Sequence, residues 1–401
     1  MKNPGDIMGF DGLIKKQREF YGTGVTKKTG FRIQALKALR GAVKRDEKII
    51  AEALYADLHR SAPQAYMTET GMIIQELNLA IRKLKSWAGK RRVPAQFFFP
   101  FSRNYIMPEP YGVVLVISPW NYPFFLSFLP LIAAISAGNC CVLKPSRAAA
   151  ASAGVISKII GSCLEPGHVS VIEPDSPAAY EVLKEKFDYI FFTGGTETGK
   201  KVLASAAENI TPVTLELGGK CPCIVAEDSD VELAAKRVAA GKFLNAGQTC
   251  VAPDYALVHK AVRPRFLSAL KTAIERMYGS NPENSPDYCR IINGVEYARI
   301  IASLEGKSFK ASAETRYIAP LVIEDASADD EIMKEEIFGP VLPVISFDSV
   351  DEAVAFVNER EKPLVLYLFA KSRAVIDRVL ASTSSGSACV NDTVVHMGNS
   401  C

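Results

Sequence analysis

The chain has 401 residues, of which 48% are hydrophobic and 23% charged, and this composition is typical of a globular protein rather than a disordered one. Its length exceeds what one hydrophobic core usually organises, so we expect two domains. Lys and Arg number 47 against 44 Asp and Glu, and the resulting charge of +3 argues against a nucleic-acid surface. The basic run at 90–92 is typical of a solvated face.

Cysteine and histidine usage argues against two further classes of protein. The nine cysteines are an odd number and indicate no disulfide framework. The four histidines lie far apart, and Cys221 and Cys223 have no second pair that would complete a zinc site, so we expect no bound metal. The N-terminal "MKNPGDIMGFDG" lacks the apolar segment of a signal peptide, which predicts a reducing, cytoplasmic location.

The first quarter of the chain predicts helices followed by an arm. Residues 12–60 and 64–89 carry apolar side chains at helical spacing, with charges between them. Residues 93–111 are rich in proline and aromatic residues and predict an extended arm or hairpin.

Residues 110–143 carry no charged side chain, a length that would fit a membrane span. Pro119, Pro123 and Pro130 interrupt the run, so we expect a buried strand, loop and helix, and no membrane segment. From here strands and helices alternate. The expected strands are 113–117, 140–144, 168–173 and 188–193, and the expected helices are 123–137, 147–162, 177–186 and 196–208. Such alternation predicts a parallel sheet that binds ligands beyond the carboxyl ends of its strands.

After Thr211 the α/β pattern starts again, which places a domain boundary near residue 211. Helices are expected at 230–242 and 263–278 and a strand at 318–323, with further α/β alternation to the end of the chain.

Three stretches contain side chains with catalytic chemistry. Cys250 follows a glycine-containing turn in "NAGQTC", although a lone cysteine is most often a small buried hydrophobe. Glu216 ends a strand before two glycines and is either a paired structural charge or a general base. Asn121 follows the first parallel strand, where its amide either donates to a developing oxyanion or caps a helix.

Together with "EEIFGPVLPV", these stretches resemble the aldehyde dehydrogenase superfamily, most closely its class 3 branch, which acts on aliphatic and aromatic aldehydes. The resemblance runs from "FRIQALKAL" to "SGSACVND" and includes "PWNYPF", "VLKPS", "TGGTETGK", "TPVTLELGGK", "GQTCVAPDY", "RYIAP" and "EKPLVLYLF". It implies an α/β fold with a Rossmann-type parallel-sheet cofactor domain, an α/β catalytic domain and a small oligomerisation hairpin. We assign these to 1–92 with 112–211, to 212–391 and to 93–111, and the C-terminal tail to 392–401.

The resemblance makes Cys250 the nucleophile that attacks the aldehyde carbon. The oxyanion would be held by the side chain of Asn121 and the backbone N–H of Cys250. Hydride transfer to the nicotinamide ring then leaves a thioester, which a water activated by Glu216 hydrolyses to the carboxylic acid. The implied enzyme is an NAD(P)-dependent aldehyde dehydrogenase that forms a homodimer.

The same resemblance assigns residues to NAD or NADP. The turn in "FFTGGTETGK" ends a strand and opens a helix that would approach the pyrophosphate, while a lysine and two residues of "EEIFGP" would hold the two riboses and the nicotinamide ring. The expected cofactor-binding residues are Lys144, Arg147, Thr193, Gly194, Gly199, Glu336 and Phe338. The turn departs from the family pattern at Gly195 and Glu197, where serine and a small residue are common.

Two further departures bear on function. The family commonly has glutamate after "KPS", but this chain has Arg147, which either accepts the 2′-phosphate of NADP or simply faces solvent. We therefore expect NADP to be used at least as well as NAD. The chain also stops at "NDTVVHMGNSC", before the loop and final strand of the family. The ending favours one alternative, a silent dinucleotide-binding remnant. A second alternative is thioester or CoA-dependent acylating chemistry on the same scaffold, which Glu216 argues against.

Overall fold

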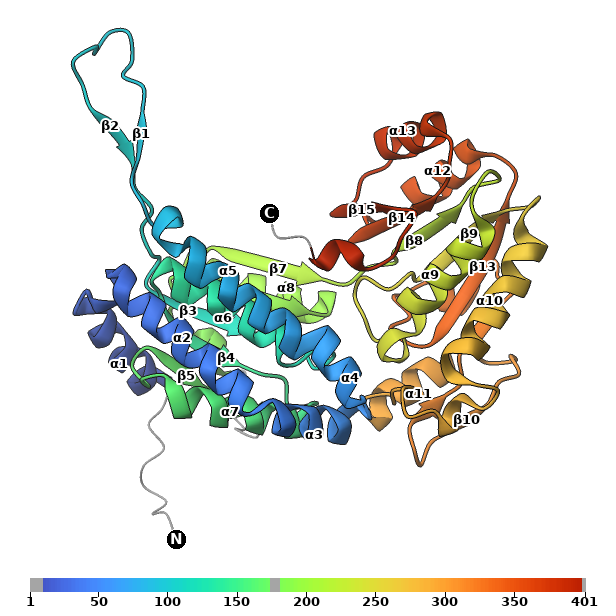
Figure 1. The fold of residues 1–401 in the computed structure, drawn as a ribbon, viewed down its shortest axis with the longest axis horizontal. Coiled ribbons are helices and arrows are strands. Elements are labelled where there is room, and N and C mark those ends of the chain that lie inside the picture. Colours follow the sequence, from blue (N-terminus) through green and yellow to red (C-terminus); the bar gives the residue numbers. More distant parts are fainter. Residues whose placement is uncertain (1–9, 174–180, 399–401) are drawn as a thin grey trace. The chain divides into compact units, whose positions relative to one another are not determined.

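The computed structural model describes residues 10–173 and 181–398. The chain forms two compact units: unit 1 comprises Met1–Asp57 and Ala62–Glu216, and unit 2 comprises Leu58–Ser61 and Leu217–Cys401 (Figure 1). The expected domain boundary at 211 lies just before the boundary of the units.

Unit 1 is built on a five-stranded sheet with helices packed against it (Figure 1). The strand order is β5-β4-β3-β6-β7, and the pairs β3/β4, β3/β6 and β4/β5 are parallel. The strands are β3 (Val113–Ile117), β4 (Cys140–Lys144), β5 (Val169–Val171), β6 (Tyr189–Gly194) and β7 (Val213–Leu217). Every residue of β3 is buried, because a parallel sheet with both faces covered needs apolar side chains on both.

The helices of unit 1 follow the predicted alternation closely. They are α1 (Phe10–Gly22), α2 (Thr29–Arg45), α3 (Glu47–Leu58), α4 (Ala62–Ala65), α5 (Gly71–Trp87), α6 (Phe125–Ala137), α7 (Ala150–Cys163) and α8 (Thr196–Glu208). A single π-helical turn, η2 (Tyr66–Thr70), joins α4 to α5. None of the described helices is long and apolar enough to cross a membrane.

The arm expected at 93–111 is a two-stranded antiparallel hairpin that follows α5 (Figure 1). Its strands are β1 (Arg91–Val93) and β2 (Asn104–Ile106). Among the strands that the structure describes, β1 and β2 form a separate two-stranded sheet.

Unit 2 contains a six-stranded, wholly parallel sheet in the order β12-β13-β9-β8-β14-β15. The strands are β8 (Pro222–Val225), β9 (Tyr255–His259), β12 (Leu321–Ile323), β13 (Val341–Phe347), β14 (Val365–Phe369) and β15 (Ser387–Val390). The helices are α9 (Val231–Phe243), α10 (Arg263–Tyr278), α11 (Gly294–Ala302), α12 (Val350–Asn358) and α13 (Arg373–Ser382). Polar side chains cap several of them, as Asp230 does by accepting from the Leu233 amide at 3.1 Å.

Two predicted elements differ in the structure. Of the helix expected at 177–186, residues 177–180 lie outside the described part of the chain, and Glu181–Lys184 form only a 3-10 turn. The Leu183 carbonyl accepts a hydrogen bond from the Ser205 hydroxyl at 2.5 Å, which ties this turn to α8. The strand expected at 318–323 is split at Pro320: β11 (Tyr317–Ile318) pairs antiparallel with β10 (Ala311–Ser312), and β12 joins the large sheet.

Candidate active site

In unit 2 the cysteine predicted as nucleophile lies in a tightly folded loop between α9 and β9. Asn245, Ala246 and Gly247 all have positive φ, at 53°, 51° and 77°. Two non-glycine residues in succession are held in the left-handed region, which is uncommon and marks a segment constrained by its surroundings. Cys250 follows three residues later and has intermediate exposure.

Gln248, which is fully buried, ties this loop to the rest of unit 2. Its side-chain amide donates to the Asn245 carbonyl at 2.9 Å and to the Arg290 carbonyl at 3.0 Å, and its Oε1 accepts from the Ile292 amide at 2.9 Å. Three hydrogen bonds in a buried setting fix the backbone that leads to the thiol. Sequence reasoning had not singled out Gln248, although it stands inside the quoted "NAGQTC".

A buried ion pair draws three separate motifs of unit 2 together. Lys220 and Asp254 lie 2.5 Å apart, with both side chains largely buried. Asp254 also accepts from the Ile337 amide at 2.9 Å, and the Lys220 ammonium donates to the Glu335 carbonyl at 2.8 Å. The ion pair therefore holds three segments in one cluster, although they lie far apart in the sequence: "LGGK", "APDY" and "EEIFG".

Glu336 lies beside this cluster with an unusual protonation equilibrium. Desolvation by burial, together with the negative charge of Asp254, raises the pKa of its carboxyl to about 8. A Cβ on Gly218 would come within 1.8 Å of the Glu336 Oε2 atom, so the glycine leaves room for that carboxyl. Buried Lys242 lies near the same group, and burial lowers the pKa of its ammonium to about 8.

Phe338, two residues further on, has a φ of 47° and is partly exposed. Its motif contacts the cysteine loop directly, because a Cβ on Gly247 would lie 2.1 Å from the Gly339 carbonyl oxygen. Unit 2 thus brings together the loop of Cys250 and the "EEIFGP" segment that contains Glu336 and Phe338.

In unit 1, Asn121 is buried in the loop between β3 and α6. The loop is held at both ends: the Ser118 amide donates to the Lys144 carbonyl at 3.1 Å, and the Ser118 and Ser127 hydroxyls lie 2.6 Å apart. Fully buried Glu69 accepts from the amides of Phe124 and Phe125 at 2.7 and 2.9 Å. The Glu69 carboxylate on η2 therefore accepts hydrogen bonds from backbone amides at the N-terminus of α6. The sequence alone did not indicate this role.

The aromatic residues after Asn121 are packing residues. Tyr122 is 8% exposed and Phe124 is fully buried. Phe124 meets Phe128 edge to face, with ring centroids 6.2 Å apart. Their burial makes these rings part of the core of unit 1.

Lys144 and Arg147 lie at and just beyond the carboxyl end of β4. Burial, and secondarily the charge of Arg147, lowers the pKa of the Lys144 ammonium. Arg147 itself is exposed on the turn before α7. Two cations at one strand end form a locally positive position suited to an anionic ligand group.

The turn that we expect to approach the pyrophosphate joins β6 to α8. Thr193 and Gly194 end β6, Gly195 is the N-cap of α8, and the Gly199 amide donates to the Gly195 carbonyl at 3.0 Å. A Cβ on Gly195 would meet no atom within 4 Å, so the backbone here is open to a ligand. Glu197 forms an exposed pair with Lys200 at 2.7 Å, which directs its charge along the helix surface.

Glu216 is the last residue of unit 1 and lies on β7. Its side chain is exposed, yet the surrounding protein removes part of its hydration and so raises the pKa of its carboxyl. A raised pKa is what a carboxylate needs to act as a general base near neutral pH.

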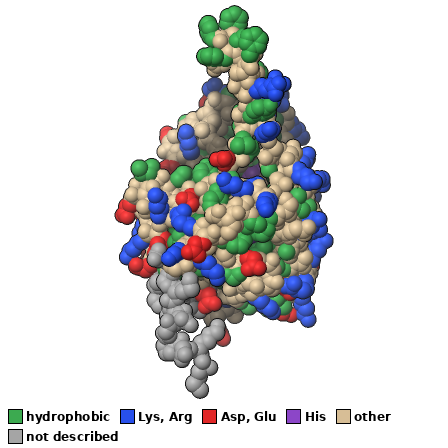
Figure 2. Space-filling model, turned by 90° about the vertical axis from the view of Figure 1, so that its left-hand side faces the viewer, with side chains coloured by type: hydrophobic (Ala, Val, Ile, Leu, Met, Phe, Trp, Pro, Cys, Tyr) green, Lys and Arg blue, Asp and Glu red, His purple; other side chains and the backbone are tan. Residues whose placement is uncertain are grey.

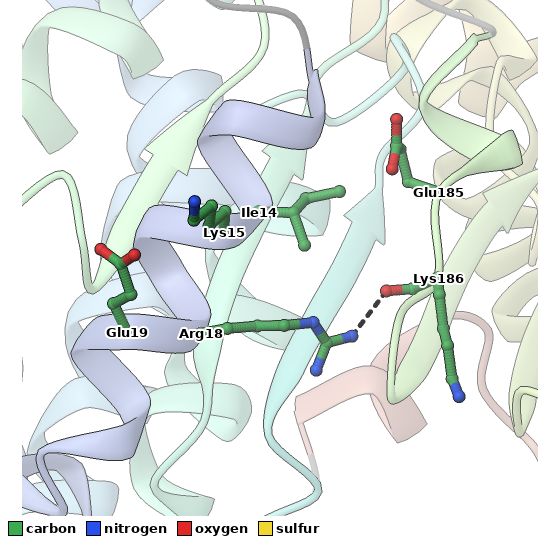
Figure 3. A pocket seen from close by; sticks show the side chains of 6 residues that line it. All are labelled: Ile14, Lys15, Arg18, Glu19, Glu185 and Lys186. Atoms are coloured by element: carbon green, nitrogen blue, oxygen red, sulfur yellow. Dashed lines mark hydrogen bonds between the residues drawn. The ribbon is translucent and has the colours of Figure 1, made fainter.

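Unit 1 also has a hollow of about 520 Å³ (Figure 3). It is lined by Ile14, Lys15, Arg18, Glu19, Glu185 and Lys186. The Arg18 guanidinium donates to the Lys186 carbonyl at 2.7 Å and lies 3.0 Å from Asp188. Because its main cation is already engaged and no predicted site residue lines it, we assign it no ligand.

The comparisons with known proteins identify the chain. The aldehyde dehydrogenase family model matches residues 25–400. The dimeric NADP-preferring aldehyde dehydrogenase of Canis lupus familiaris is 42% identical over 389 residues, which are 96% of this chain and 86% of that protein. The 4,4'-diaponeurosporen-aldehyde dehydrogenase of Staphylococcus aureus is 42% identical over 388 residues, 95% of this chain and 84% of that one.

Solved structures agree. The substrate-bound state of Staphylococcus aureus AldH superposes with a TM-score of 0.94 at 40% identity, covering 98% of this chain and 87% of that one. An NAD+ complex of aldehyde dehydrogenase from Bacillus cereus gives 0.86 at 25% identity, covering 96% and 81%. The chain belongs to the aldehyde dehydrogenase family. It is an NAD(P)-dependent oxidoreductase that oxidises aldehydes, and the alternative of a silent binding protein is not favoured.

Proposed function

We propose that Cys250 is the nucleophile of this aldehyde dehydrogenase, with Asn121 and the Cys250 amide as oxyanion donors and Glu216 as the base of hydrolysis. The observation that carries the proposal is the left-handed turn at 245–247, which presents a partly exposed thiol on a fixed backbone. Bound NAD(P)+ supplies the acceptor for the hydride. The chain's own residues form the carbon–sulfur bond, stabilise the oxyanion and take the proton from water.

The other cysteines support the choice of Cys250. Burial raises the pKa of the Cys140 thiol to about 12 and that of Cys163 to about 11, and it raises those of Cys221 and Cys223 further. A thiol with so high a pKa supplies almost no thiolate near neutral pH.

Single-turnover formation of NADH and NADPH from a medium-chain aldehyde tests the nucleophile. Cys250→Ser should abolish the burst, whereas the matched variant Cys163→Ser should retain it. A full burst from a folded Cys250→Ser protein would refute the assignment. Asn121→Ala should lower the burst rate by about 10²–10³-fold, the usual loss for one oxyanion donor.

Glu216 is proposed to act after hydride transfer, so replacing it should affect the kinetics differently from Cys250→Ser. Glu216→Gln should retain the burst of NAD(P)H and slow steady-state turnover by about 10²–10⁴-fold, because the thioester forms but is not hydrolysed. Loss of the burst as well would assign Glu216 to an earlier step or to structure.

We further propose that Arg147, with Lys144, binds the 2′-phosphate, so that NADP is used at least as well as NAD. The cations at the end of β4 and the NADP-preferring relative support this. Arg147→Glu should weaken NADP+ binding by about ten- to a hundredfold while changing NAD+ binding little, since one charge-assisted hydrogen bond is lost. Lys158→Glu, at an exposed residue of α7, the helix that follows Arg147, is the control. A 2′-phosphate preference that survives in Arg147→Glu would contradict the proposal.

The proposal extends to assembly and location. A homodimer is supported by the relative described as dimeric, and a reducing cytoplasm is proposed because the nine cysteines are an odd number.

A further inference from the structure

Two side chains from the parallel sheet of unit 2 hold the backbone at the proposed nucleophile. Cys221, immediately before β8, donates from its thiol to the Cys250 carbonyl at 3.4 Å. Tyr367, in the middle of β14, donates from its hydroxyl to the Val251 carbonyl at 2.5 Å. Cys221 and Tyr367 are both fully buried, so both donors come from the core of unit 2. The two peptide groups that follow the Cys250 Cα atom are therefore each anchored through their oxygen.

The peptide group that precedes the Cys250 Cα atom is anchored in the same way. The Thr249 carbonyl accepts from the Ala252 amide at 2.9 Å. A trans peptide group is planar, with its N–H opposite its C=O, so fixing the Thr249 carbonyl also fixes the direction of the Cys250 N–H. Because the peptide planes on both sides are held, the direction of the Cα–Cβ bond of Cys250 is set as well. The thiol and the N–H of Cys250 thus both depend on these hydrogen bonds.

The Tyr367 hydroxyl also binds the segment after β15. It accepts from the Val394 amide at 3.3 Å while it donates to the Val251 carbonyl. Thr393, which is 1% exposed, fixes this segment, because its hydroxyl donates to the Arg237 carbonyl on α9 at 2.6 Å. The hydroxyl of Tyr367 therefore cannot turn away from the nucleophile loop without losing two hydrogen bonds.

Burial raises the pKa of the Cys221 thiol and that of the Tyr367 hydroxyl, so both groups keep the hydrogen that they donate. On the basis of the proposed role of Cys250, we infer that Tyr367 and Cys221 are positioning residues, which hold the thiol and the N–H of Cys250 in the geometry for attack on the aldehyde. Such geometry matters for the rate, because a displacement of about 1 Å can cost about 10²-fold.

Burst kinetics of the full chain test the role of Tyr367. Tyr367→Phe keeps the ring and removes only the hydroxyl. It should lower the rate constant of the NAD(P)H burst by about tenfold, because the buried Val251 carbonyl loses its donor and the loop shifts. The KM for the aldehyde and the dissociation constant of NAD+ should change by less than about twofold, because the change acts on the reacting geometry and not on binding.

Tyr288→Phe is the matched control. Tyr288 is also fully buried in unit 2, and its hydroxyl donates to the Ile318 carbonyl at 2.8 Å. Its loss should lower the denaturant midpoint as much as Tyr367→Phe does and leave the burst unchanged. Equal burst rate constants in the two variants would overturn the role of Tyr367.

Two variants of Cys221 separate its hydrogen bond from its packing. Cys221→Ala should lower the burst rate constant by about fivefold, whereas Cys221→Ser, whose hydroxyl still donates, should retain it within about twofold. Equal losses in both variants would overturn the role of the Cys221 thiol as a donor.

Cys250→Ser distinguishes this inference from the proposal on which it rests. A burst that persists in Cys250→Ser would refute the nucleophile and the positioning residues together. A burst that is lost in Cys250→Ser but unchanged in Tyr367→Phe and Cys221→Ala would refute the positioning residues alone.

Discussion

At the scale of single residues, Glu336 shows how neighbours set a protonation state. From the sequence we expect Glu336 to bind the nicotinamide ribose. A carboxylate does so by accepting hydrogen bonds from the ribose hydroxyls. With the pKa of this carboxyl raised to about 8, it is mostly neutral at pH 7. The ionised fraction of Glu336 increases as the pH rises through that value.

We therefore expect NAD+ to bind more tightly at higher pH. Between pH 7 and 9 the dissociation constant should fall by up to about tenfold, because the binding-competent fraction of Glu336 rises by that factor. NAD+ is used because the 2′-phosphate of NADP+ would add its own titration. Fluorescence titration of Glu336→Gln should show weaker binding and no such fall, whereas Glu335→Gln, at an exposed neighbour, should behave as the parent protein. The same pH profile in Glu336→Gln would contradict the assignment.

Gly247 provides a second prediction at this scale. Gly247→Ala would place a Cβ 2.1 Å from the Gly339 carbonyl oxygen and force alanine to adopt a φ of 77°. We expect the free energy of unfolding to fall by about 2–5 kcal/mol and turnover to fall with it, as the loop of Cys250 is displaced. Gly154→Ala on α7, where a Cβ meets nothing within 4 Å, should be neutral or stabilising in the same denaturant titration. Equal stability of the two variants would show that the loop tolerates the shift.

At the scale of elements, the N-terminus of α6 depends on a carboxylate from another part of unit 1. Glu69→Ala would leave the buried amides of Phe124 and Phe125 without their acceptor. We expect a loss of about 2–4 kcal/mol in the free energy of unfolding and a smaller loss for Glu69→Gln, whose amide oxygen still accepts. Turnover should also fall, because Asn121 lies in the adjoining loop.

Guanidinium denaturation of the two Glu69 variants measures this effect. Glu52→Gln, at an exposed residue on α3, should change stability by less than about 0.5 kcal/mol. If Glu69→Ala were as stable as Glu52→Gln, the carboxylate would not be the group that supports α6.

At the scale of the whole molecule, we expect a homodimer. Light scattering of the purified chain should give twice the mass of one chain, and the value should persist on dilution to working concentrations, since most cyclic assemblies of identical chains are dimers with one self-complementary interface. A single-chain mass at every concentration would contradict this, and it would leave the proposed roles of Cys250 and Glu216 untouched.

The sequence by itself determined most strands and helices of the two parallel sheets. Buried parallel strands are continuous apolar runs, and these can be recognised from neighbouring residues alone. β3, β4 and α10 have the predicted bounds. It also identified the family and the candidate residues, since those stand in long motifs in a fixed order. It failed at 181–184, where the predicted helix is only a 3-10 turn.

Only the tertiary structure decided how the candidate residues are supported. The pair of Lys220 with Asp254, the hydrogen bonds of Gln248 and the acceptor role of Glu69 join segments with no local signal for each other. The raised pKa of Glu336 arises from burial, which no residue pattern expresses. The arm at 93–111 was predicted from the sequence, but the high exposure of its phenylalanines, such as Phe97 and Phe101, is seen only in the folded chain (Figure 2).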